Sequence, residues 1–237
     1  MNFREYIFIH KMGKEGVRVS KIRSRFIRKS AKPGAKRKPK SILMLGSKNI
    51  GKTCLAKRFV SGEFAENHVA TVEERYAKDV LFKEYQLHIE IVDIDAFEFP
   101  AMRDLSVKEA KIIMLVYEVG SRKSLDILKK IYDAIKDVCD FPVPVVIVGT
   151  KADKLESKEM IEGDADSNVQ EFVNELNASL HTNATKAIIT SAKLGFNVTE
   201  AFDFILEEMV KTMNTASLTL SGNELSAPKR EGCCTLI

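Results

Sequence analysis

The chain lacks the long apolar runs and the cysteine patterns that define several classes of protein. No stretch of about 18 consecutive apolar residues occurs, so the sequence offers no helix suited to crossing a bilayer. The first ten residues also lack the long apolar segment of a secretory signal peptide. We therefore expect a protein of a reducing compartment, cytosolic or on a cytosolic surface. The cysteines show neither metal-ligand spacing nor a disulfide framework: Cys54, Cys139, Cys233 and Cys234.

Positive charge is concentrated at the N-terminal end of the 237 residues. Residues 1–40 hold 14 of the 37 Lys and Arg but two of the 33 Asp and Glu, a net +12, so the rest carries 23 against 31, or −8. This basic arm has no core-forming pattern and contains Pro33, Gly34 and Pro39, so we expect disorder. A solvated tail, attraction to anionic lipids and nuclear import all remain open. Nucleic-acid binding is disfavoured, because Phe26 is the only aromatic residue within the basic stretch at 17–40.

The segment GSKNIGKT follows the short apolar run Ile42–Leu45 and precedes a helix-compatible stretch. Its two glycines allow the backbone to turn tightly and to aim N–H groups at phosphate oxygens. Its lysine then reaches the terminal phosphates, and its threonine coordinates Mg²⁺. The segment therefore predicts a phosphate-binding loop. The candidate residues are Gly46, Ser47, Lys48, Asn49, Ile50, Gly51, Lys52, Thr53 and the adjoining Cys54.

Strand-like and helix-like segments alternate along residues 41–212. This alternation predicts a parallel-type α/β sheet covered on both faces by helices. Asp93 closes the apolar run at 88–92, so its carboxylate is expected at a strand end, where it can hold the Mg²⁺ shell through water. The final helix is expected to begin after Asn197, with its apolar residues on one face.

Two later motifs predict a base pocket. The buried-type strand at 145–148 leads into Thr150, Lys151 and Asp153. The aspartate can accept two hydrogen bonds from the ring N–H and the amino group of guanine, which adenine cannot supply in that arrangement. A last strand at 187–190 leads into the second motif, which consists of Ser191, Ala192 and Lys193. The backbone N–H of Ala192 could donate a hydrogen bond to the guanine carbonyl oxygen.

In these motifs and their order, the chain resembles the small GTPases of the Ras superfamily over about 40–212. Thr53 and Thr71 are 18 residues apart, and Thr71 and Asp93 are 22 apart, both as in Ras proteins. The resemblance implies a three-layer P-loop NTPase fold with a central, mostly parallel six-stranded sheet, and GTP or GDP with Mg²⁺ as ligands. It also implies that Phe64 packs against guanine and that Thr71 reads the γ-phosphate in a GTP-ordered loop. The implied metal ligands are Thr53, Thr71 and Asp93.

Two further segments narrow the resemblance. TVEERY at 71–76 resembles the Ras effector strand, and FPAM at 99–102 resembles the Di-Ras and RasD branches of the Ras subfamily. This implies effector proteins that add a strand to the sheet edge, and an exchange factor and an activating protein as further partners. We expect a monomer. The implied effector residues are Glu73, Glu74 and Tyr76.

The residues that serve hydrolysis depart from the family pattern. Where Ras proteins read DTAGQE, this chain reads DIDAFE at 93–98. Phe97 replaces the glutamine that orients the attacking water, so no catalytic residue is intact and hydrolysis should be slow. Ala96 loses the backbone freedom of the usual glycine. Asp95 adds a carboxylate near the γ-phosphate, which would repel GTP more than GDP.

Lys48 is a second departure, because Ras has glycine in this position. Its side chain would crowd out the arginine finger of an activating protein. It could also lend its own charge to phosphate, or pair with Asp95, and the sequence leaves these alternatives open. Relative to Ras, the acidic stretch at 155–168 is the expected insertion, interpreted as a solvated loop.

The chain ends in Cys234–Ile237, a C-a-a-X pattern that would place an isoprenoid on Cys234. Residues 213–237 are expected to form a flexible tail. One lipid binds membranes only reversibly, so a second signal is needed, either palmitoylation of Cys233 or the basic arm. These features predict the cytoplasmic face of a membrane, in the first place the plasma membrane, and leave a nuclear pool open.

Two functions remain open from the sequence. The first is a membrane-tethered guanine-nucleotide switch of the Ras type with slow GTP hydrolysis. The second is an interaction module that no longer switches and holds GDP or GTP as a structural ligand. Nucleotide content and single-turnover hydrolysis would separate them.

Overall fold

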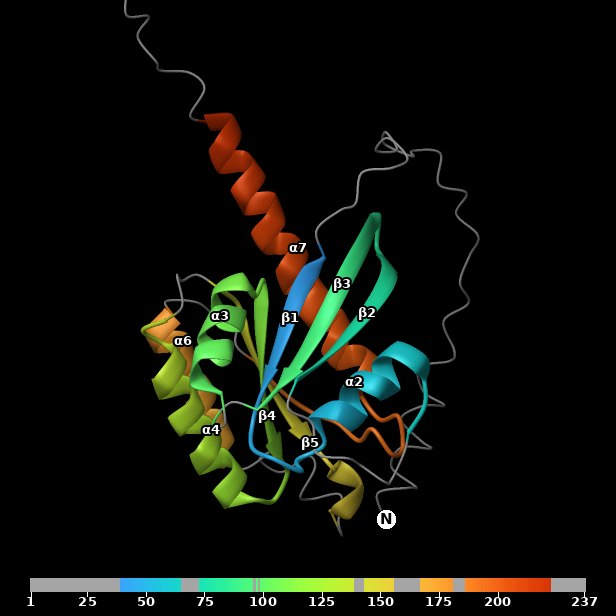
Figure 1. The fold of residues 1–237 in the computed structure, drawn as a ribbon, viewed down its shortest axis with the longest axis vertical. Helices are drawn as coiled ribbons and strands as arrows, with labels where there is room; N and C mark the ends of the chain where they lie inside the picture. The colour runs from blue at the N-terminus through green and yellow to red at the C-terminus, as the bar shows by residue number, and fades with distance from the viewer. Residues whose placement is uncertain are drawn as a thin grey trace, which may run out of the picture.

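The computed structural model describes residues 39–64, 73–95, 97, 99–138, 143–155, 167–180 and 186–222. Six strands form one sheet in the order β2-β3-β1-β4-β5-β6 (Figure 1). The neighbouring strands are parallel except for β2 and β3, which form an antiparallel pair. The predicted six-stranded, mostly parallel sheet is therefore confirmed. The strands are β1 (Lys40–Leu45), β2 (Glu73–Phe82), β3 (Tyr85–Ile94), β4 (Ile112–Glu118), β5 (Val145–Thr150) and β6 (Ala187–Ile189).

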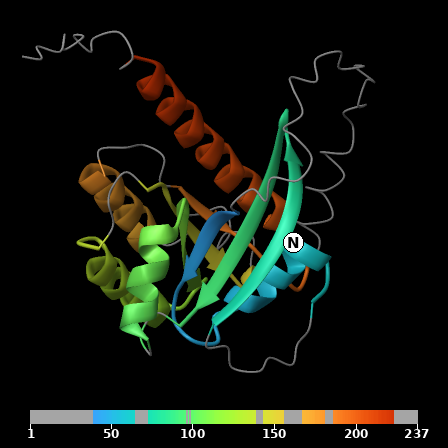
Figure 2. The ribbon, with the colours of Figure 1, turned by 45° about the horizontal axis from the view of Figure 1, so that its top comes forward.

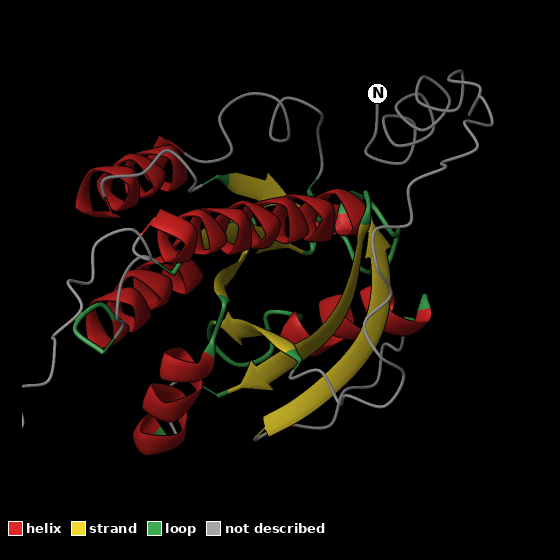
Figure 3. Ribbon diagram, turned by 90° about the horizontal axis from the view of Figure 1, so that it is seen from above, coloured by secondary structure: helices red, strands yellow, loops and turns green. Residues whose placement is uncertain are grey.

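Helices cover both faces of the sheet, as expected for three layers (Figure 3). Successive side chains of a strand point to opposite faces, so Ile42 and Met44 pack with α2 and α7, whereas Leu43 and Leu45 face the side of α3, α4 and α6. Figure 2 shows these last three helices grouped on one side and the long β2–β3 ribbon at the sheet edge. The helices are α2 (Lys52–Ser61), α3 (Pro100–Glu109), α4 (Arg122–Ile135), the short η1 (Ala152–Lys154), α6 (Ser167–Leu180) and α7 (Val198–Gly222).

The parallel strands β1, β3, β4 and β5 end at the same edge of the sheet, the lower end in Figure 1. Their central positions are buried on both faces, which is why β1, β4 and β5 read as continuous apolar runs. The register pairs Met44 with Asp93 and Glu118 with Thr150. The loops that leave these strand ends therefore meet at one place.

Helix α7 is longer than the sequence predicted. Its first half packs on the sheet and against α2. Phe202 of α7 stacks on Phe59 of α2 with ring centroids 3.8 Å apart. It then continues to Gly222, ten residues beyond the boundary at 212, and extends past the sheet in Figure 1. Residues 213–222 hold no proline and their first glycine is Gly222, so nothing local ends the helix earlier. The remaining tail, 223–237, and residues 1–38 of the arm predicted at 1–40 lie outside the described residues. The end of that arm was placed too late, because Lys40 is already the first residue of β1 and pairs with Ile89 of β3.

The segment predicted as a loop at 155–168 is shorter than expected, because helix and core residues begin within its bounds. Ser167 and Asn168 are the first residues of α6, which packs Val169 and Phe172 into the core. At the other end, Leu155 is buried in a small apolar cluster with Phe196. Residues 156–166 lie outside the described part of the chain.

Candidate functional site

The loop between β1 and α2 is built for close approach to a ligand. A Cβ atom at Gly46 would lie 2.3 Å from the Val116 carbonyl oxygen and 2.5 Å from Ile50 Cδ1, so only glycine fits there. Gly51 has φ 98°, and Asn49 has φ 61°, both in the left-handed region. The backbone therefore turns sharply just before α2 begins at Lys52.

Lys52 is held inside this loop. Its ammonium donates hydrogen bonds to the carbonyl oxygens of Gly46 (3.1 Å) and Ser47 (3.0 Å). Burial lowers the pKa of Lys52 below its ordinary value, although Asp93 and Asp95 act to raise it. Lys52 therefore places a buried positive charge against the loop. Such a charge suits an anionic ligand such as phosphate.

Thr53 and Asp93 come together beside the lysine. The Thr53 hydroxyl donates a hydrogen bond to the Asp93 carboxylate, and both residues are buried. In the described part of the chain, no group of three or more His, Cys, Asp or Glu could hold a metal. One hydroxyl and one carboxylate suit Mg²⁺, which keeps water and phosphate oxygens as its other ligands. The third predicted metal ligand, Thr71, lies outside the described residues.

The motif after β5 is tied to the phosphate loop. Lys151, with φ 58°, donates from its ammonium to the Asn49 carbonyl oxygen at 2.5 Å. The Thr150 hydroxyl lies within hydrogen-bond distance of the carbonyl oxygens of Ile50 and Tyr117. These contacts bring two motifs about a hundred residues apart into one site.

Glu118 is a site residue that sequence reasoning missed. It ends β4, and its carboxylate accepts hydrogen bonds from Lys151 (2.8 Å) and Lys154 (2.7 Å). Burial acts to raise the pKa of Glu118, but the two lysines outweigh it and hold the pKa below its ordinary value. The available signal was an acidic residue at the end of a buried apolar strand, because such a side chain reaches the carboxyl edge of the sheet.

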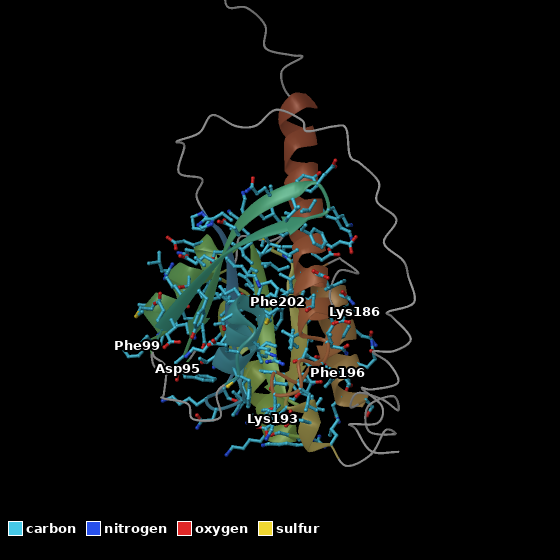
Figure 4. All side chains as sticks on the ribbon, turned by 90° about the vertical axis from the view of Figure 1, so that its right-hand side faces the viewer. Asp95, Phe99, Lys186, Lys193, Phe196 and Phe202 are labelled. Carbon is cyan, nitrogen blue, oxygen red and sulfur yellow. The ribbon has the colours of Figure 1, made fainter. Side chains whose placement is uncertain are left out.

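The two base-side motifs also meet. The Ser191 hydroxyl donates to the Asp153 carboxylate at 2.6 Å, and the Ser191 oxygen accepts the N–H of Leu194. Ala192 is buried and Lys193 is exposed at the lower end of the molecule in Figure 4. Phe64 is half-buried at the end of the described loop after α2, and Cys54 is half-buried on α2.

The segment after β3 contacts the phosphate loop. Lys48 Nζ lies 3.5 Å from Asp95 Oδ2, so the ion pair that the sequence left open is present. The backbone N–H of Phe97 donates to Asp95 Oδ1 at 3.0 Å. The Phe97 ring is 49% exposed, and Phe99 is 38% exposed beside α3 (Figure 4). Ala96 lies outside the described residues.

The predicted effector residues lie on β2, at the sheet edge. Glu73 pairs with Arg75 at 2.6 Å, and Arg75 also reaches Glu90 on β3 at 2.9 Å. The Tyr76 hydroxyl donates to the carboxylate of Glu74. Glu73 and Glu74 are thus already engaged with neighbouring side chains of this chain.

The fold and these residues define a P-loop protein with a guanine-nucleotide type of site. A model of the Ras family matches residues 41–211, so the chain belongs to the Ras family of small GTPases, which bind GTP. It is 31% identical over 193 residues to the GTP-binding protein Di-Ras2 of Pongo abelii, covering 80% of this chain and 90% of that protein. It is 29% identical over 203 residues to the GTP-binding protein Di-Ras1 of Homo sapiens, covering 83% and 96%. The GTP-binding protein RHB1 of Saccharomyces cerevisiae is 27% identical over 187 residues, with 78% and 90% covered. The predicted place near the Di-Ras branch is confirmed.

Proposed function

We propose that this chain is a membrane-associated GTP switch that hydrolyses its nucleotide slowly. One contrast within the site carries the proposal. Lys52, Thr53 and Asp93 are buried and arranged as a phosphate and Mg²⁺ site requires. In the position of the water-orienting glutamine, by contrast, Phe97 presents a half-exposed ring without a polar atom.

In the proposed switch, the chain's own residues bind and orient the nucleotide. Lys52 would exchange its two carbonyl partners for phosphate oxygens, and Thr53 and Asp93 would hold Mg²⁺, which neutralises phosphate charge. Asp153 would accept hydrogen bonds from guanine while Ser191 keeps its carboxylate oriented. Lys151 would keep the base-reading motif in register with the phosphate loop.

Slow hydrolysis follows from the groups that surround the attacking water. A phenyl ring cannot hydrogen-bond to water as glutamine does, and Lys48 stands where an activating protein would insert its arginine. The expected single-turnover rate is below the Ras value of about 3–5 × 10⁻⁴ s⁻¹.

Purified, GTP-loaded protein tests this expectation. Phe97→Gln should raise the single-turnover rate several-fold, because it restores a water-binding group, whereas the matched control Phe99→Gln should leave it unchanged. A wild-type rate equal to that of Ras would contradict the argument. Bound guanine nucleotide with no hydrolysis at all would favour the alternative, a non-switching interaction module.

Membrane association is the second part of the proposal. Among the helices that the structure describes, none is long and apolar enough to span a bilayer. The proposed anchor is lipid on Cys234 and Cys233, with the basic arm as an additional signal; all three lie outside the described residues. Helix α7 leads toward this tail at the end of the molecule away from the phosphate loop (Figure 1). The proposed location is the cytoplasmic face of the plasma membrane, with a nuclear pool as an alternative destination of the arm.

Fractionation of cells tests the anchor. Cys234→Ser should move the protein from the membrane to the soluble fraction, and Cys139→Ser, a cysteine outside the phosphate loop, is the control. A Cys234→Ser variant that stayed fully membrane-bound would remove the lipid hypothesis.

Membership of the Ras family suggests effectors, exchange factors and activating proteins as kinds of partner. We place the effector surface at β2, because β2 ends the sheet and can accept an added strand. Glu73 and Glu74 would then meet a basic partner after leaving Arg75 and Lys57. Reversing the charge of Glu74 should weaken effector binding without changing nucleotide affinity.

A further inference from the structure

Two lysines and two aspartates meet at one end of the phosphate loop. Lys48 Nζ lies 3.5 Å from Asp95 Oδ2. Lys52 lies near enough to both Asp93 and Asp95 for each carboxylate to act on its charge, and Lys48 acts on it in the opposite sense. With two positive and two negative side chains, this cluster is formally neutral.

The strand order explains why these side chains meet. β1 lies directly beside β3, with Met44 opposite Asp93. Lys48 follows three residues after the end of β1, and Asp95 follows one residue after the end of β3. The two loops therefore leave adjacent strands at the same edge and face each other beside the Thr53–Asp93 pair.

The two partners differ in burial, and this decides which of them can move. The Asp95 side chain is 6% exposed, and the Phe97 N–H holds its other oxygen at 3.0 Å. The Lys48 side chain is 56% exposed and reaches Asp95 on a flexible stem. The carboxylate is thus fixed, whereas the ammonium can swing to another anion with little loss of packing.

The Lys48–Asp95 pair lies close to the expected position of the terminal phosphate. The Thr53–Asp93 metal site and the Lys52 ammonium mark where the β- and γ-phosphates lie in a loop of this kind. A γ-phosphate adds negative charge to a neutral cluster. The fixed Asp95 carboxylate opposes that charge, and the Lys48 ammonium favours it.

We propose that Lys48 and Asp95 set the preference of this site between diphosphate and triphosphate guanine nucleotide. Asp95 holds Lys48 when no γ-phosphate is bound, and Lys48 transfers to the γ-phosphate when GTP binds. Binding of GTP therefore costs the ion pair and meets a fixed carboxylate, whereas binding of GDP does neither. The inference rests on the proposed nucleotide site and names the residues that tune it.

Equilibrium binding of GDP and of GTPγS to the full chain with Mg²⁺ tests the pair. Asp95→Asn should tighten the binding of GTPγS about tenfold, because it removes the repulsion between the fixed carboxylate and the γ-phosphate near the protein surface. The affinity for GDP should stay within about threefold of the wild-type value. Lys48→Met should weaken GTPγS about tenfold with a similarly small effect on GDP. The double variant should fall between the two single variants. Glu207→Gln, which breaks the remote 3.0 Å pair with Lys83, is the control and should change neither affinity.

A purely structural role for the pair predicts a different result. If Asp95→Asn changes the affinities for GDP and GTPγS by the same factor, or changes neither, the inference is wrong. Lys48 is exposed, so Lys48→Met should fold and decides the question even if Asp95→Asn does not fold. An unchanged ratio of GDP affinity to GTPγS affinity in Lys48→Met also overturns the inference. Failure of the wild-type chain to bind GDP would instead count against the proposed nucleotide site.

Discussion

Replacing Glu118 by alanine should speed the release of guanine nucleotide by about 30-fold. The carboxylate of Glu118 holds the ammonium of Lys151, whose second partner is the Asn49 carbonyl oxygen in the phosphate loop. Through this chain of contacts, Glu118 links the segment after β5 to the phosphate loop.

The magnitude follows from the geometry and exposure of the pair. The Lys151 and Glu118 side chains are only 27% and 22% exposed, and the N–O distance is 2.8 Å. A hydrogen bond between charged groups contributes about 1.5–3 kcal/mol. Solvent screening at this exposure places the pair near the lower half of that range, about 2 kcal/mol. At about 1.4 kcal/mol per factor of ten, its loss corresponds to roughly 30-fold.

Displacement of a fluorescent GDP by excess unlabelled GDP measures the release rate. Lys154→Ala is the matched control, because it removes the other, 61% exposed partner of the same carboxylate and should change the rate less than about threefold. Equal rates for Glu118→Ala and Lys154→Ala would refute the reasoning. The position of Lys151 would then depend on Asn49 alone.

Three other predictions test the pH dependence at Glu118, the close packing at Gly46 and the metal site at Asp93. The pKa of Glu118 is lowered below its ordinary 4.5 in the folded protein, so its stabilising contribution is present above pH 4.5 and lost as the pH falls through the folded value. Urea unfolding of Glu118→Gln should therefore depend less on pH than that of the wild type as the pH falls below 4.5. Gly46→Ala should lower the free energy of unfolding by about 3 kcal/mol, because its Cβ would lie 2.3 Å from the Val116 carbonyl oxygen. Gly62→Ala, with φ 77° but open space around the new Cβ, should lose only about 1 kcal/mol, and similar losses for both would contradict the clash. Asp93→Asn should abolish the slowing of nucleotide release by Mg²⁺, measured with and without a chelator, and a retained Mg²⁺ effect would place the metal elsewhere.

Local pattern was sufficient for the parts of the site that lie within one short segment. The phosphate loop depends on glycines and a lysine at fixed spacing, so Gly46–Thr53 could be located from the sequence. Asp93 and Asp153 could be placed because each follows a recognisable apolar strand. The alternation of strands and helices likewise determined the α/β class, since the apolar central strands had to be covered on both faces.

Boundaries were less certain, because local signals for ending an element were weak. Between 212 and 222 no proline interrupts the chain, so α7 continues where a tail was expected. The start of α6 at Ser167 is set by packing of Val169 and Phe172 in the core, and the acidic segment before it masks that boundary.

The sequence by itself thus determined that this protein has a Ras-type guanine-nucleotide site in which Phe97 stands in the position of the usual glutamine. Only the tertiary structure decided which side chains from different strands and loops pair beside that site. Glu118 reaches Lys151 because β4 lies beside β5, and Lys48 reaches Asp95 because β1 lies beside β3. Strand order and register create these contacts between residues 33 and 47 positions apart, and no local pattern in the chain encodes them.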